Sequence, residues 1–319
     1  MLVRALRALA QAVALGAAVW VLLRTAQPHW HTLVALRFSV HWGWLVIASV
    51  VWLGSFTLLV GLWATSLRWW QQRLDFATAL RMFVLTNLAR YIPGAVWQFM
   101  GLAAFAIEER VSPVAVTSAV LMQQLVLLAT GVLLSLALAP ALLGPTTAAL
   151  PPWGAPALVV TGLLFLMWVF PVALPALQRR LEALLHRNLP LPMPKPPVAS
   201  FALYLVGTVL GWVGYGASFW LFAHAWLGDA APGPLLAAAA FVASYVAGII
   251  AVFAPGGIVV RETALVAALR GTIGTDPAFL LAVSARLWLI ALEIVGASVV
   301  IALGGRMQRD QGLRNTKTN

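Results

Sequence analysis

The sequence predicts an all-α polytopic membrane protein, and its composition, its long apolar runs and the position of its charges all lead to that fold class. Hydrophobic residues make up 62% of the 319-residue chain and charged residues only 9%, whereas a soluble domain needs roughly a quarter of charged residues to coat its surface. Apolar runs recur from end to end, and helices satisfy their own backbone groups in lipid. We therefore expect residues 1–319 to form a single transmembrane domain.

Six apolar segments are long enough to cross the ~30 Å hydrocarbon core as helices of about 20 residues. The first follows Arg4 and Arg7, and we expect it to be a retained span. Its apolar part is too long for a signal peptide, and no small-residue cleavage site follows it. The expected spans lie near residues 6–26, 43–66, 112–139, 153–174, 199–227 and 277–303.

Two further apolar stretches are interrupted in the middle by Pro-Gly pairs. Proline removes a helix donor and clashes with the preceding turn, while glycine lets the backbone reverse. Each stretch is therefore predicted to be two helices joined by a tight turn, as either a re-entrant hairpin or a pair of tilted spans. The stretches are residues 76–107, interrupted at Pro93 and Gly94, and residues 234–270, interrupted at Pro255, Gly256 and Gly257.

The lysine and arginine residues of the expected loops gather on one side of the membrane, and only Arg24, Arg37 and Arg270 fall on the other. Cytoplasmic loops carry the excess of basic residues. We therefore expect a multi-pass protein of the bacterial inner (cytoplasmic) membrane with both termini in the cytoplasm, a basic cytoplasmic linker at 175–198 and a basic cytoplasmic tail at 305–319. The net charge of +11 reflects this topology, and no nucleic-acid partner is expected.

The two interrupted stretches belong to what we interpret as two inverted halves, residues 40–174 and 199–304. After each interruption come an apolar half-helix, a charged connection and a proline that begins the next span, with Ser112 and Asp276 as predicted N-caps. In the expected topology the two stretches enter from opposite faces, which is the pattern that marks a transporter's binding site. The alternative is that each Pro-Gly pair only kinks a span for packing.

Charged residues at membrane depth are costly, and they usually face an interior cavity. We predict that the two turns and the charges near them line one lipid-headgroup cavity. Its arginines outnumber its glutamates, which suits an anionic phosphate, because guanidinium is a permanently charged fork of donors. The alternative is that these charges pair internally and only fix helix positions, as Arg286 and Glu293 would from two turns apart on one helix face. The predicted cavity residues are Arg90, Pro93, Gly94, Gln98, Pro255, Gly256, Gly257, Arg261, Glu262, Arg286 and Glu293.

Nothing in the sequence has the pattern of a catalytic or metal site. Cysteine is absent, which excludes disulfides and thiolate chemistry. Prenyl-diphosphate chemistry needs clustered carboxylates to hold Mg²⁺, but the aspartates are scattered, at Asp75, Asp229, Asp276 and Asp310. We therefore expect a protein that is not an enzyme and has no catalytic residues, metal ligands or cofactor. A membrane-embedded prenyl-diphosphate enzyme is the less favoured alternative.

The stretches "NLARYIPGAVWQ" and "PGGIVVRETALVAAL" resemble the two signature stretches of the lysylphosphatidylglycerol synthase transmembrane-region family, which includes the flippase half of the multiple peptide resistance factor. The resemblance extends over roughly residues 40–305. It implies a protein that moves a polar-headed lipid between leaflets. Carried over residue by residue, it assigns Arg90, Pro93 and Gly94 to the first motif and Pro255, Gly256, Gly257, Arg261 and Glu262 to the second.

The function that these observations favour is a flippase or scramblase for an anionic or polar-headed lipid of the phospholipid, aminoacyl-lipid or polyprenyl-phosphate type. No nucleotide-binding motif is present, so a gradient, a partner or downhill flow must supply the energy. The expected partners are membrane lipids with anionic headgroups, together with a second copy of the chain or a protein of envelope synthesis. A non-transporting scaffold for envelope-lipid synthesis is the alternative from another functional class.

Overall fold

A computed structural model of the chain describes residues 40–91, 97–143, 151, 153–185, 196–251, 257 and 259–315. This part of the chain consists of α-helices, short 3-10 turns and connections, without a β-strand, which confirms the predicted all-α membrane fold. The helices are α3 (Trp42–Ser66), α4 (Phe76–Asn87), α5 (Trp97–Glu108), α6 (Pro113–Ala137), α7 (Ala139–Leu143), α8 (Gly154–Leu185), α9 (Val198–Leu227), α10 (Pro234–Ile250), α11 (Val260–Ile273) and α12 (Thr275–Asn315).

Five of the described helices, α3, α6, α8, α9 and α12, are long and apolar enough to cross a membrane. They coincide with the spans predicted between residues 43 and 303, and the span expected near 6–26 lies outside the described residues. Two helices run beyond their expected ends. α8 continues through Pro171 and Pro175 to Leu185, and α12 continues to Asn315, so parts of the predicted linker and tail are helical.

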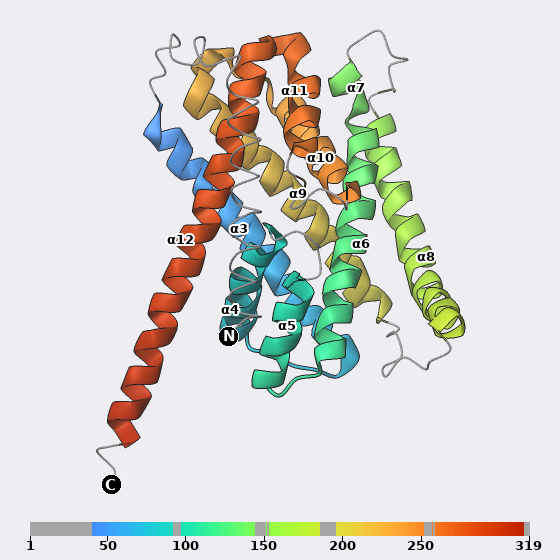
Figure 1. Cartoon of the computed structure of the whole chain (residues 1–319). Helices are drawn as coiled ribbons and strands as arrows, with labels where there is room; N and C mark the ends of the chain where they lie inside the picture. The colour runs from blue at the N-terminus through green and yellow to red at the C-terminus, as the bar shows by residue number, and fades with distance from the viewer. Residues whose placement is uncertain are drawn as a thin grey trace.

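Both interrupted stretches form pairs of shorter helices. α4 is followed by a 3-10 turn (η3, Leu88–Tyr91) before α5. α10 ends at Ile250 and α11 begins at Val260, with Val259 as the N-cap of α11. The residues at the two interruptions, 92–96 and 252–256, lie outside the described residues. Figure 1 shows α4 and α5 together toward one end of the bundle and α10 and α11 toward the other. At 1.5 Å per residue, α4 is only about 18 Å long, shorter than the hydrocarbon core.

Local sequence explains where several of these helices begin. The Ser112 side chain accepts a hydrogen bond from the backbone N–H of Ala115 at 3.3 Å, and Pro113 occupies the first turn, as predicted for an N-cap. Asp276 is different, because α12 already begins at Thr275 and places that carboxylate inside the first helical turn. A negative charge there still interacts favourably with the helix dipole.

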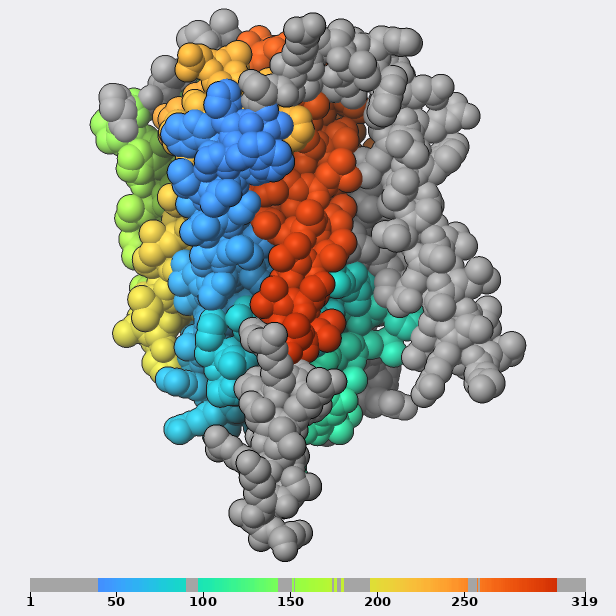
Figure 2. Space-filling view, turned by 90° about the vertical axis from the view of Figure 1, so that its left-hand side faces the viewer, coloured from blue at the N-terminus to red at the C-terminus, as the bar shows by residue number. Residues whose placement is uncertain are grey.

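Among the described helices, α3 and α9 form the most extensive packing contact. Gly207 and Gly211 lie one turn apart on α9, and a Cβ atom on either would lie 2.8 Å from the nearest side-chain carbon of Leu62 or Leu59 on α3. Small residues at this spacing let membrane helices approach each other closely. Figure 2 shows α3 beside α12 on one face of the molecule, where the indole N–H of Trp288 donates to the Ser49 hydroxyl at 2.9 Å.

The long helix that follows each interrupted stretch packs against the other stretch. α6, which follows α5, contacts α10, and α12, which follows α11, contacts α4. This exchange brings side chains from both interrupted stretches into the same central region of the bundle.

Candidate functional site

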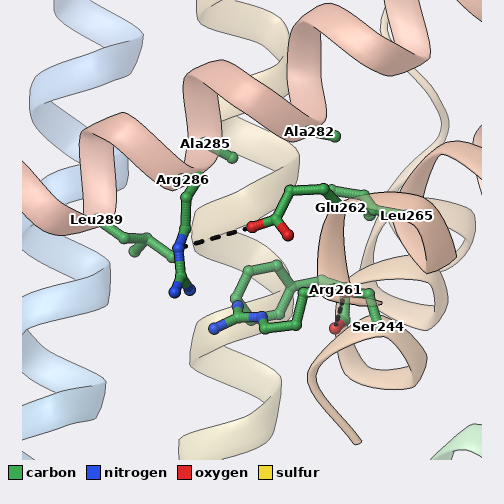
Figure 3. Close-up of a pocket in the computed structure, with 9 residues that line it drawn as sticks. Ser244, Arg261, Glu262, Leu265, Ala282, Ala285, Arg286 and Leu289 are labelled. Atoms are coloured by element: carbon green, nitrogen blue, oxygen red, sulfur yellow. Dashed lines mark hydrogen bonds and ion pairs between the residues drawn. The ribbon is translucent and has the colours of Figure 1, made fainter. Parts of the chain in front are cut away.

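Two neighbouring cavities lie among the helices in this central region. The larger, which we call the central cavity, has a volume of about 50 Å³ and is lined by residues from both predicted halves. The smaller, which we call the Arg286 cavity, has a volume of about 20 Å³ and lies among α10, α11 and α12 (Figure 3). Arg261 and Leu289 line both cavities, so they form the boundary between them. The polar residues of the central cavity are Asn87, Gln123, Gln124, Tyr215, Tyr245, Arg261 and Glu293.

The first half contributes amides to the central cavity. Asn87 is the last residue of α4 and is buried. Gln123, on α6, donates from Nε2 to the carbonyl of Leu59 at 2.7 Å. Its buried Oε1 accepts no hydrogen bond within the described part of the chain. Buried polar atoms are normally hydrogen-bonded. Oε1 of Gln123 is therefore a hydrogen-bond acceptor that a donor of a bound group can use.

The second half contributes Arg261, whose guanidinium stacks on aromatic rings. Its central carbon lies 4.2 Å from the centroid of the Tyr245 ring and 5.6 Å from that of Phe241. These distances are within the range of cation–π attraction, which strengthens when water is excluded. The Arg261 side chain thus packs against α10 and lies between the two cavities.

Two glycines make room for this arrangement. A Cβ atom on Gly248 would lie 2.8 Å from Cδ of Arg261, and one on Gly257 would lie 2.9 Å from Cα of Gly248. Gly257 also has φ +68°, a conformation that L side chains rarely adopt. The predicted site residue Gly257 therefore has a clear local role, which is to let the chain pass against α10. Gly248 was not predicted, although a glycine in the interior of an apolar helix is a signal of close packing.

Arg286 and Glu262 form an ion pair between α12 and α11. The Nε atom of Arg286 lies 3.6 Å from Oε1 of Glu262, and the side chains are 3% and 11% exposed. The sequence alternative paired Arg286 with Glu293, but the ion pair at the Arg286 cavity joins it to the neighbouring helix (Figure 3). Glu293 is buried and lines the central cavity.

The remaining predicted residues divide into two groups. Gln98 is buried on α5 but lines neither the central cavity nor the Arg286 cavity. The backbone of Arg90 lies in η3, three residues after Asn87, and nothing is described of its side chain. The predicted cavity residues that lie outside the described part of the chain are Pro93, Gly94, Pro255 and Gly256.

The charges that line the two cavities balance among the described residues. Arg261 and Arg286 are positive, and Glu262 and Glu293 are negative. The predicted surplus of positive charge therefore depends on Arg90. Across the described chain, no three histidine, aspartate or glutamate side chains are arranged to hold a metal ion. The site can accordingly bind a group that accepts hydrogen bonds from guanidinium donors and donates a hydrogen bond to Oε1 of Gln123.

Comparison with known families identifies one match. A family model described as "Lysylphosphatidylglycerol synthase TM region" matches residues 8–296. The match includes both interrupted stretches and every residue that lines the two cavities. No curated protein and no solved structure matches the chain significantly.

Proposed function

Since the chain belongs to the lysylphosphatidylglycerol synthase transmembrane-region family, we propose that it is a flippase or scramblase, which moves an anionic or polar-headed lipid between the leaflets of a membrane. The observation that carries this proposal is the central cavity. Amides of the first half and the guanidinium, phenol and carboxylate groups of the second half line one chamber inside an apolar helix bundle. Buried polar groups in a membrane protein normally serve a substrate path or one another.

The helix pairs explain how such a path would form. We propose that α4–α5 and α10–α11 are re-entrant hairpins that enter from opposite faces and meet the central cavity near the middle of the bilayer. Backbone that leaves the helical pattern is tolerated at that depth only where protein buries it or a cavity lines it. A headgroup would pass Gln123, Asn87 and Arg261 while its acyl or prenyl chains stay in lipid.

The exposed arginines indicate how the protein is oriented. Arg68, Arg73 and Arg110 lie in the connections that lead into and out of the α4–α5 pair, whereas exposed Arg270 lies near the end of α11. By the positive-inside rule, the end of the bundle with α4 and α5 faces the cytoplasm of a bacterial inner membrane. Because the chain has no cysteine, Arg73→Cys and Arg270→Cys are single labelling sites. An impermeant thiol reagent outside cells should label only Arg270→Cys, and the opposite pattern would invert the topology.

The carboxylates support transport rather than catalysis. Glu262 and Glu293 line different cavities, and Glu262 is paired with Arg286. Prenyl-diphosphate chemistry instead needs several carboxylates around one Mg²⁺ ion. We therefore propose a transporter without a catalytic centre, whose partners are the lipids themselves.

The test is lipid exchange in reconstituted vesicles. Purified protein is placed in vesicles that contain labelled phospholipids or labelled polyprenyl phosphates, and the appearance of each lipid in the opposite leaflet is followed. We expect faster exchange of at least one anionic lipid than in empty vesicles. If every labelled lipid exchanges at the same rate as in empty vesicles, the proposed function is wrong.

A matched pair of variants distinguishes a headgroup path from a scaffold. Arg261→Ala removes the guanidinium that lines both cavities, and Arg270→Ala removes an exposed guanidinium from the same helix. We expect Arg261→Ala to lose exchange and Arg270→Ala to keep it, at equal amounts of folded protein. A scaffold would retain its cellular phenotype in both variants.

A further inference from the structure

We propose that Glu262 is a proton-binding site that couples lipid movement to the movement of protons. In this inference, the Glu262 carboxylate and the phosphodiester of the lipid compete for the guanidinium of Arg286, so that the phosphodiester binds together with a proton. The inference rests on the proposed function and adds the energy source to it.

Among the described residues, the Glu262 carboxylate has few polar contacts. Its contact with Arg286 is an ion pair at 3.6 Å, which is longer than a hydrogen bond. Its second oxygen, Oε2, is buried and has no hydrogen-bond partner among the described residues. A buried charge is stable only when pairing and hydrogen bonds compensate for its lost hydration. Glu262 lacks part of that compensation, which favours uptake of a proton when its cation is engaged elsewhere.

The second support is the set of charges around Glu262. Two helices pack against α11, and their titratable groups near the cavities are Arg286 and Glu293 on α12 and Tyr245 on α10. Arg261 stands beside Glu262 on α11 itself. Among the described residues, two arginines and two glutamates sum to zero, and protonation of Glu262 changes that sum to one positive charge. The protonated site therefore attracts a monoanionic phosphodiester more strongly than the deprotonated site does.

The third support is the size of the Arg286 cavity. A volume of about 20 Å³ accommodates roughly one water molecule. A phosphate group fits there only if the Glu262 carboxylate moves away from Arg286. Arg261 and Leu289 border both cavities, so the route from the central cavity to Arg286 passes them.

These steps balance in charge and atoms. A proton from water on one side binds the Glu262 carboxylate, the ion pair with Arg286 opens, and the phosphodiester takes the place of the carboxylate. When the phosphodiester leaves, Glu262 releases the proton to water and pairs with Arg286 again. One proton thus moves with one monoanionic headgroup in the same direction, without net charge.

The test measures proton uptake directly, in the absence of transport. Dihexanoyl phosphatidylglycerol is a suitable probe, because a phosphodiester keeps a single charge near neutral pH and does not itself bind the proton. Its heat of binding to the full-length protein in detergent is measured in two buffers with different heats of ionisation, and the difference reports the protons taken up. We expect an uptake approaching one proton per bound probe, and an affinity that falls by about tenfold for each unit of rising pH over the range in which that full proton is taken up.

Two variants identify the proton-binding group. Glu262→Gln is uncharged at every pH, so we expect the probe to bind it without proton uptake and with an affinity that does not depend on pH. Glu108→Gln removes an exposed carboxylate at the end of α5 and should behave as the wild type. Equal proton uptake by wild type and Glu262→Gln would overturn the proposal. Binding to the wild type without proton uptake, or no binding, would overturn it as well, even if Glu262→Gln does not fold.

Lipid exchange separates this inference from the proposed function. In vesicles with a pH gradient, we expect the wild-type protein to accumulate the labelled lipid in the leaflet facing the more alkaline side, and we expect Glu262→Gln to abolish that accumulation. If the wild-type protein exchanges the lipid but the pH gradient does not change its distribution, proton coupling is contradicted and the proposed flippase or scramblase function is not. If the wild-type protein does not exchange the lipid, the proposed function itself is contradicted.

Discussion

The central carbon of the Arg261 guanidinium lies over the ring of Tyr245, 4.2 Å from the ring centroid. The two residues come from α11 and α10, and both line the central cavity. In a site shielded from water, a cation–π contact of this kind contributes about 2 kcal/mol. It therefore holds the cation of the candidate site at the boundary between the two cavities, where a headgroup would meet it.

Substitution of Tyr245 tests whether this contact positions Arg261. Tyr245→Phe keeps the ring face, and we expect it to keep the rate of lipid exchange within about twofold of wild type. Tyr245→Leu removes the ring, and we expect a loss of roughly tenfold or more in the exchange rate, because about 2 kcal/mol of positioning energy disappears. Exchange rates in vesicles at equal protein content measure the difference. Equal rates for Tyr245→Phe and Tyr245→Leu would show that the ring does not position the guanidinium.

Gly248 gives a second test of the same geometry. Gly248→Ala adds a methyl group that would lie 2.8 Å from Cδ of Arg261, so either the side chain or α10 must shift. Overpacking of this kind costs about 1–3 kcal/mol, and we expect a lower unfolding temperature together with slower exchange. Gly271→Ala is the control, because its methyl group would meet no atom within 4 Å and alanine favours a helix. If both variants behave alike, the close approach at Gly248 is not important for the site.

The ion pair between Arg286 and Glu262 predicts a characteristic pattern of stabilities. Arg286→Met leaves a buried carboxylate without this cation, and we expect a loss of about 3–5 kcal/mol in the free energy of unfolding. The double variant Arg286→Met with Glu262→Leu removes both charges and should lose much less. Chemical unfolding in detergent micelles measures the wild type, Arg286→Met and the double variant. A double variant that is less stable than Arg286→Met would contradict the pairing of these two side chains.

The stability that the Asp75 N-cap gives to α4 depends on pH. Its carboxylate accepts a hydrogen bond from the backbone N–H of Thr78 at 3.0 Å at the start of α4. Hydrogen bonds from the Thr78 side chain and backbone hold the pKa of Asp75 below its ordinary value. The carboxylate therefore stabilises the fold at neutral pH, and that stabilisation is lost as pH falls through the lowered pKa, below about pH 4.

We expect Asp75→Ala to lower the stability by about 1 kcal/mol at neutral pH. The difference from wild type should shrink as the pH is lowered through that range, because protonation removes the same interaction from the wild-type protein. Unfolding temperatures of the two proteins across the pH range measure this. A difference that does not change with pH would mean that the charge of Asp75 contributes nothing to the cap.

The helices could be predicted from the sequence because their causes are local. Long apolar runs predicted five spans that the structure contains, and the Ser112-Pro113 pair predicted the start of α6. The two Pro-Gly interruptions predicted that residues 76–107 and 234–270 would each divide into two helices. The extension of α8 through Pro171 and Pro175 could not be predicted in this way, because a helix tolerates proline in the membrane when neighbouring groups satisfy the freed carbonyls.

The charged residues of the candidate site could be predicted from the sequence, but their partners could not. Composition and spacing were sufficient to select Arg261, Glu262, Arg286 and Glu293 as charged residues of a membrane interior, because a charge in an apolar segment is evident from the sequence alone. Only the tertiary structure decided that Arg286 pairs with Glu262 and that Arg261 stacks on Tyr245. Each of these contacts joins two helices. Such partners depend on how far each helix is rotated about its axis and how closely glycines let it approach its neighbour.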